Sequence, residues 1–190
     1  MKTMRELSLE ISTWARANFG NTPVTSLRVM KNNFPMSDAT VELNWLATLL
    51  GMGEEIGELH AAMNVPIVEA NYLDEVIDAI ADIGIYFCDY MARRNTIYDF
   101  ECNGVPSIDM SVVYGRLLHT ELKHAQKIRG MGDNLTFASE HRVACHNFYC
   151  SLNIVCLANS GRNLPNVIDE VFQQTVAKRN WKANSANGVV

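Results

Sequence analysis

Two consecutive stretches decide the fold: NWLATLLGMGEEIGELHAAM, residues 44–63, and NYLDEVIDAIADIGIYFCDYMARR, residues 71–94. In both, apolar residues recur every three or four positions, which is the spacing of one face of an α-helix. Pro66 lies in the short link between them, where it interrupts helical geometry. The two stretches therefore predict two long helices that fold back on each other as an antiparallel hairpin.

The same spacing extends over nearly the whole chain, and no alternating strand pattern with flanking turn signals accompanies it. Helices are expected over residues 4–19, from Ser37 or Asp38 to Met63, and over residues 69–94, 107–128, 135–158 and 165–181. Residues 24–37 are expected to be irregular. The prediction is an all-α helix bundle forming a single domain over residues 1–182, followed by a flexible tail over residues 183–190.

Composition narrows the class of protein. The chain has 190 residues, of which 48% are hydrophobic, so a single domain can bury a sizeable core. A formal net charge of -5 argues against a surface that binds nucleic acid or an anionic membrane, and favours a small-molecule partner. The N-terminus carries scattered charges, and no apolar run approaches the roughly 20 residues of a membrane span. These features predict a cytoplasmic protein without membrane association.

The cysteines fit that prediction. They are odd in number, form no CxxC pair, and lie at Cys88, Cys102, Cys145, Cys150 and Cys156. Free cysteine packs as a small hydrophobic residue, so we expect buried reduced thiols rather than disulfides or a zinc site.

Each helix of the predicted hairpin carries three acids on one face. The acids are Glu54, Glu55 and Glu58 on the first helix, and Glu75, Asp78 and Asp82 on the second. At about 100° per residue, each set spans an arc of roughly 100° or less. Like charges at this spacing repel, and no lysine or arginine lies between Met52 and Tyr90. Either the acids form an ordinary solvated face, or a bound cation compensates them; oxygen-only ligands favour Mg²⁺.

Glycines within the predicted helices favour close packing. They are Gly51, Gly53 and Gly57 in the first helix and Gly84 in the second. Each costs roughly 1 kcal/mol relative to alanine in a helix interior. We expect them to let the two helices approach closely enough for both acidic faces to reach one metal ion.

The acids also resemble a known motif. Glu54-Glu55-x-x-Glu58 followed by Glu75-x-x-Asp78 is similar to the EExxE…ExxD signature of MazG-like pyrophosphohydrolases, a family that includes the all-α dUTPases. GRLLHTELKHAQKIRG, residues 115–130, and VAKRNWK, residues 176–182, resemble segments of its phage-type members. The resemblance implies a four-helix core with extra helices. It also implies Mg²⁺, with Mn²⁺ as a substitute, and hydrolysis of a nucleoside triphosphate to the monophosphate and pyrophosphate.

The resemblance implies residue roles as well. Glu55, Glu58, Glu75 and Asp78 would bind the metal, and Glu54 and Asp82 would be the catalytic acids that orient water or hold a second ion. The stretch from Asp82 to Tyr86 also resembles the hydrophobic segment that follows the family's aspartate. Asp78 and Asp82 therefore both remain candidates for the principal ligand.

A bound nucleoside triphosphate would also need protein side chains that contact its phosphates and its base. The candidate phosphate-binding cations are Lys123, Lys127 and Arg129, and Lys178, Arg179 and Lys182. They could equally complement helix dipoles. Trp14 and Asn18 share a helix face and are the candidate base contacts, although a tryptophan at helical spacing is more often part of the core. The family's usual oligomers suggest a homodimer or homotetramer, in which the C-terminal cations reach another subunit's site. Phage-type relatives suggest dGTP as substrate and a role in controlling or cleaning a nucleotide pool.

Two alternatives remain open. Glu121-x-x-His124 matches the ExxH element of ferritin-like di-iron bundles, but only one copy is present. The chain could also be a catalytically silent helical module that senses nucleotides or binds a partner protein.

Overall fold

The computed structural model describes residues 2–19, 26–28, 40–42, 45–64, 71–102, 107–127 and 134–178. Within these ranges, six helices account for nearly all regular structure, so the all-α class is confirmed. The helices are α1 (Met4–Phe19), α2 (Leu46–Met63), α3 (Tyr72–Arg93), α4 (Met110–Lys127), α5 (Asn134–Ser160) and α6 (Leu164–Lys178). None of these helices is long and apolar enough to cross a membrane.

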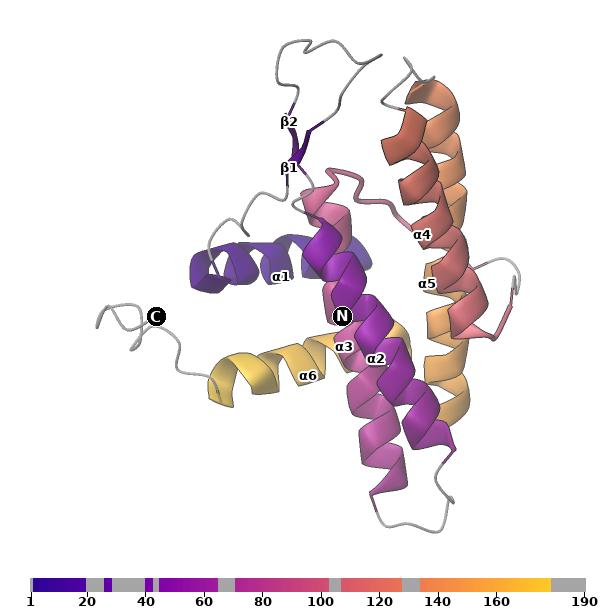
Figure 1. Ribbon diagram of the computed structural model, residues 1–190. Helices are drawn as coiled ribbons and strands as arrows, with labels where there is room; N and C mark the ends of the chain where they lie inside the picture. Colours follow the sequence, from indigo (N-terminus) through magenta and orange to yellow (C-terminus); the bar gives the residue numbers. More distant parts are fainter. Residues whose placement is uncertain are drawn as a thin grey trace.

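α3 is the central helix of the bundle. It packs against α2 as the predicted antiparallel hairpin, and it also contacts α1, α5 and α6 (Figure 1). α4 and α5 form a second pair of adjacent helices on one side of that hairpin, whereas α1 and α6 cross it on the other side at steep angles (Figure 1). Apolar side chains of α3 such as Ile80, Ile83 and Phe87 are fully buried among these neighbours. The core is therefore built around the second of the two stretches that predicted the hairpin.

The start of α2 was predicted wrongly. The helix begins at Leu46, not near Ser37 or Asp38, and Thr40–Glu42 form strand β2 instead. β2 pairs antiparallel with β1 (Ser26–Arg28), with Leu27 opposite Val41. Two of the three β2 residues, Thr40 and Val41, are β-branched and favour extended backbone, which explains why the nearby capping residues do not start a helix here. This two-stranded ribbon also corrects the expectation that residues 24–37 are irregular throughout.

The cysteines behave as expected in most positions. All five are free, and Cys88, Cys145, Cys150 and Cys156 are buried, whereas Cys102 is exposed. Burial raises the pKa of Cys88 to about 12, so this thiol stays protonated and inert at neutral pH.

Candidate functional site

An acid-lined pocket of about 610 Å³ lies where α1, α2, α3 and α6 meet. Glu55 from α2 and Asp78 and Asp82 from α3 contribute carboxylates to its lining. Trp14 from α1 and Phe172 from α6 contribute aromatic rings. The pocket thus combines a cluster of negative charge with aromatic side chains.

The register of the hairpin brings the carboxylates together. A side chain at Gly51 would lie only 2.6 to 2.8 Å from the ring of Tyr86, so these two residues face each other across the α2–α3 contact. Because the helices are antiparallel, one turn further along α2 reaches Glu55 while one turn back along α3 reaches Asp82. Asp78 lies one more turn back on the same face of α3.

Glu55 experiences the charge of the whole cluster. Its pKa is raised to about 7, first because burial disfavours the carboxylate, and then because Asp82, Glu58, Glu54 and Asp78 repel the negative charge, in that order. Glu54 and Glu58 are exposed and do not line the pocket, but they lie close enough to act on Glu55. A cation would relieve this repulsion.

Glu75 does not take part in the cluster. Its side chain is exposed, does not line the pocket, and accepts a hydrogen bond from Asn71 Nδ2. The acids that the structure brings together are therefore Glu55, Asp78 and Asp82, with Glu54 and Glu58 nearby. Asp78 and Asp82 are the two candidates for the principal α3 ligand, and both line the pocket.

The carboxylates of the pocket suit Mg²⁺ that is bound together with substrate phosphates better than a metal ion that is held by protein ligands alone. In the described part of the chain, no three acidic, histidine or cysteine side chains form a group that could hold a metal ion by themselves. Mg²⁺ rarely needs such a cage, because it is usually bound through one or two carboxylates together with water and substrate phosphates. Carboxylate oxygens that repel one another are suitable ligands for Mg²⁺ that binds together with a polyphosphate.

Sequence reasoning missed a cation in this pocket. Arg93 lines it together with Asp89, and Arg93 Nε donates a hydrogen bond to Asp89 Oδ2 at 2.8 Å. Both side chains are almost completely buried. Their spacing could have revealed them, since Asp82, Tyr86, Asp89 and Arg93 follow one another at intervals of three or four residues on one face of α3.

The two candidate base contacts have different surroundings. Trp14 lines the pocket and meets Phe172 edge to face, with ring centroids 5.5 Å apart. Asn18 does not line the pocket, and its Nδ2 donates to the backbone oxygen of Trp14 at 2.8 Å. The aromatic wall is therefore made by Trp14 and Phe172, a pair that no local sequence pattern could connect.

The candidate phosphate-binding cations do not meet the acids in the described structure. Lys123 binds Glu140 at 3.1 Å and lines a separate groove between α4 and α5. The other predicted cations lie outside the described residues or side chains; they are Lys127, Arg129, Lys178, Arg179 and Lys182. Arg93 is the cation found in the lining of the acidic pocket.

The ExxH element does not present both of its side chains as ligands. Glu121 is buried and its Oε1 accepts hydrogen bonds from Tyr90 and from Arg94 Nε, the latter at 2.8 Å. The ring of His124 instead stacks on Phe137, with centroids 3.7 Å apart. Glu121 is thus already neutralised within the core.

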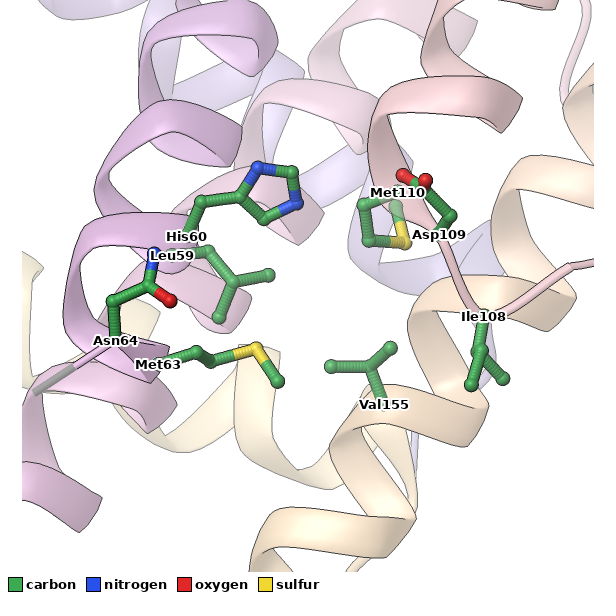
Figure 2. A pocket seen from close by; sticks show the side chains of 8 residues that line it. All are labelled: Leu59, His60, Met63, Asn64, Ile108, Asp109, Met110 and Val155. Carbon is green, nitrogen blue, oxygen red and sulfur yellow. The ribbon is translucent and has the colours of Figure 1, made fainter. Parts of the chain in front are cut away.

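A second pocket, of about 390 Å³, lies between α2, α4 and α5. Figure 2 shows His60 and Asn64 on the α2 side and Asp109 at the start of α4 on the other. Asp109 Oδ1 accepts hydrogen bonds from the backbone N–H of Ser111 at 2.9 Å and Val112 at 3.3 Å, so this carboxylate caps α4. The pocket has no cluster of acids in its lining and is the weaker candidate.

Comparisons of this chain with protein-family models, with curated proteins and with solved structures found no match. The likeness to MazG-like enzymes thus rests on the acidic motif and on the two segments at residues 115–130 and 176–182.

Proposed function

We propose that this protein is a Mg²⁺-dependent nucleoside triphosphate pyrophosphohydrolase of the MazG-like kind. The observation that carries the proposal is the pocket in which Glu55, Asp78 and Asp82 gather on the α2–α3 side while Trp14 and Phe172 form an aromatic wall. A nucleotide has matching parts, since its phosphates bind divalent cations and its base stacks on aromatic rings. The EExxE motif supports the same assignment.

Mg²⁺, when bound, would neutralise phosphate oxygens and act as a Lewis acid at the reacting phosphorus. Glu55 and Asp78 are the residues that would hold it, with Glu58 close by. Burial and then repulsion by the neighbouring acids raise the pKa of Glu55, and the repulsion makes binding of a cation favourable at this position.

The remaining chemistry requires positioning and one proton transfer. A water molecule attacks the α-phosphorus, the bond from that phosphorus to the α,β-bridging oxygen breaks, and pyrophosphate leaves with the bonding electrons. The proton of the attacking water passes to a carboxylate. Of the two candidates, Asp82 lines the pocket whereas Glu54 does not, so we assign this role to Asp82.

Substrate identity and assembly remain parts of the proposal. A deoxynucleotide such as dGTP, a role in nucleotide-pool control and a homo-oligomer follow from the family resemblance. A catalytically silent nucleotide-sensing module would use the same pocket but would release no pyrophosphate.

The decisive experiment incubates the purified protein with each nucleoside triphosphate and Mg²⁺ and measures pyrophosphate against inorganic phosphate. Glu55→Gln and Asp82→Asn should lower kcat/KM by about 100-fold or more, because the first weakens a metal ligand and the second removes the proton acceptor. Asp74→Asn is the matched control, since Asp74 is an exposed α3 acid outside the pocket. Unchanged Mg²⁺-dependent turnover in Glu55→Gln would refute the assignment, and absence of pyrophosphate from every triphosphate would refute the activity.

A further inference from the structure

One carboxylate oxygen of Asp89 accepts no hydrogen bond within the described structure. The residue is 7% exposed, and its Oδ2 is held by Arg93 Nε at 2.8 Å. Its Oδ1 is buried and has no hydrogen-bond partner among the described residues. An unsatisfied buried acceptor destabilises the fold, so a donor is expected to complete it. Because Asp89 lines the acidic pocket, a bound ligand can supply that donor.

The position of Asp89 indicates which part of a nucleotide would reach it. It lies seven residues after Asp82 on the same face of α3, about 10 Å further along the helix axis at 1.5 Å per residue. A nucleotide whose phosphates bind at the acids would therefore direct its base, not its phosphates, toward Asp89. Thr48, which also lines this end, donates its hydroxyl to the Trp45 backbone oxygen at 2.6 Å and so does not complete Asp89.

The chemistry of Asp89 limits what it can recognise. An ionised carboxylate only accepts hydrogen bonds, so it pairs with an amino group and repels a carbonyl oxygen at the same position. Arg93 fixes the orientation of the Asp89 carboxylate, because its Nε donates to Oδ2 and leaves Oδ1 to accept from a ligand. A site that holds a fixed buried acceptor discriminates strongly against analogues that lack the donor.

We propose that Asp89 is a specificity residue that accepts a hydrogen bond from an exocyclic amino group of the nucleobase, so that the pocket selects amino-bearing bases over their carbonyl counterparts. The proposal rests on the proposed nucleotide site. It concerns the selection of substrate, not the reaction at phosphorus, and assigns Arg93 the role of a positioning residue.

Three pairs of nucleotides test this inference, because the members of each pair differ at one exocyclic position. dCTP and dUTP differ at the 4-amino or 4-oxo group, and dATP and dITP differ at the 6-amino or 6-oxo group. dGTP and dITP differ at the 2-amino group, which dITP lacks. The wild-type protein should show a kcat/KM at least about 10-fold higher for the amino member of the pair that it accepts best. A preference for the member without the amino group, or equal values in all three pairs, would overturn the inference.

Asp89→Asn provides the sharper test. In the variant, the amide oxygen can still accept from Arg93, which places the amide nitrogen, a donor, toward the base. The preference for the amino member should fall at least about 10-fold and, where the pair has an oxo member, reverse in favour of it. If the variant instead lowers kcat/KM for all five nucleotides by one common factor, Asp89 does not recognise the base. Asp74→Asn is the control and should keep the wild-type ratio.

Binding separates this inference from the proposed activity. Dissociation constants for the non-hydrolysable α,β-methylene analogues of the same five nucleotides, measured by calorimetry, give the same ratios without turnover. A preference for amino-bearing analogues in a protein that hydrolyses nothing would refute the enzyme but support the role of Asp89. Arg93→Gln should reduce the preference while circular dichroism shows a retained helical fold, and an unchanged ratio in that variant would contradict the positioning role. If Asp89→Asn does not fold, the wild-type ratios and Arg93→Gln decide.

Discussion

Glu55 is placed where its charge destabilises the metal-free fold. Burial and the neighbouring acids raise its pKa to about 7, so the folded state binds a proton more tightly than the unfolded chain does. The stability associated with this proton is therefore present at low pH and is lost as pH rises toward and through 7. The same repulsion favours binding of a cation, which is a common conflict between stability and function.

We therefore expect Glu55→Gln to stabilise the metal-free protein at high pH while it lowers kcat/KM by about 100-fold or more. With EDTA at pH 8, the melting temperature of the variant should exceed that of the wild type by about 2 °C or more, and the difference should nearly vanish at pH 5. Millimolar Mg²⁺ should stabilise the wild type more than the variant. Scanning calorimetry measures both effects, and a less stable variant at pH 8 in EDTA would show that the repulsion is not significant.

Sequence and structure differ on whether Glu75 or Asp82 belongs to the site. The motif resemblance favours Glu75 as a ligand, because its spacing to Asp78 is correct. In the structure, its exposed carboxylate accepts a hydrogen bond from Asn71 outside the pocket, whereas Asp82 lines the pocket. Helical periodicity could predict that the α3 acids share a face, but a face about 60° wide does not specify which of its members points to the partner helix.

We expect Glu75→Gln to keep kcat/KM within about 3-fold of the wild type, and Asp82→Asn to lower it by about 100-fold. Steady-state kinetics with the preferred triphosphate at saturating Mg²⁺ compares the two variants directly. A large loss in Glu75→Gln with little effect of Asp82→Asn would return the ligand role to Glu75.

At the scale of the helices, some of the glycines allow the close packing that the sequence suggested and one does not. A Cβ atom at Gly51 would meet the ring of Tyr86 on α3, and one at Gly53 would meet Tyr114 on α4. Gly84 accommodates Ile168 of α6, whereas a Cβ atom at Gly57 would have nothing within 4 Å. Close packing is thus correct for three of the four, but only Gly51 lies at the contact between α2 and α3, whereas Gly53 and Gly84 admit side chains from α4 and α6. Local sequence could not indicate those partners, because they come from distant segments.

Gly51→Ala and Gly57→Ala should have opposite effects on stability. The first would drive the Tyr86 ring from its place and should cost about 1–3 kcal/mol through overpacking. The second gains helix propensity without steric conflict and should stabilise the protein by up to about 1 kcal/mol. Because Tyr86 lines the pocket, Gly51→Ala should also raise KM, whereas Gly57→Ala should not. Urea denaturation of both variants provides the comparison, and effects of the same sign would contradict the packing argument.

At the scale of the whole molecule, the hairpin of α2 and α3 could be predicted from periodicity and the pocket could not. One wall of the pocket comes from that hairpin, but the other comes from α1 and α6, which lie far apart in the sequence (Figure 1). Their packing depends on how complete faces fit together, as at the contact of Trp14 with Phe172. The acids could therefore be named in advance, whereas the Asp89–Arg93 pair and the aromatic wall required the assembled bundle.

A buried polar cluster joins the acidic hairpin to the second pair of helices. Glu121 of α4 accepts hydrogen bonds from Tyr90 of α3 and from Arg94, which directly follows α3. His141 Nε2 of α5 lies 3.3 Å from the same carboxylate oxygen. His141 Nε2 is also 2.7 Å from the Tyr90 hydroxyl, which already donates to Glu121. A proton on His141 Nε2 satisfies both contacts, so three helices share one hydrogen-bond network.

The charge of Glu121 is what this network stabilises. Burial alone would raise the pKa of Glu121, but His141, Arg94 and Tyr90 outweigh it and lower the pKa overall. A lowered pKa means that the carboxylate stabilises the fold above its ordinary pKa, and that this stabilisation is lost as pH falls through the lowered value. The contribution of the network to stability should therefore be full at pH 7 and smaller in acid.

Glu121→Gln should test whether this network holds the two halves of the bundle together. We expect the variant to lose about 3–5 kcal/mol at pH 7, because Arg94 then loses its buried counter-charge. Urea denaturation at pH 7 and at about pH 3.5 should show this deficit shrinking at the lower pH. Glu140→Gln is the control, since its partly exposed pair with Lys123 should be worth about 1 kcal/mol or less. Equal losses in the two variants would mean that the buried network contributes no more than a surface ion pair.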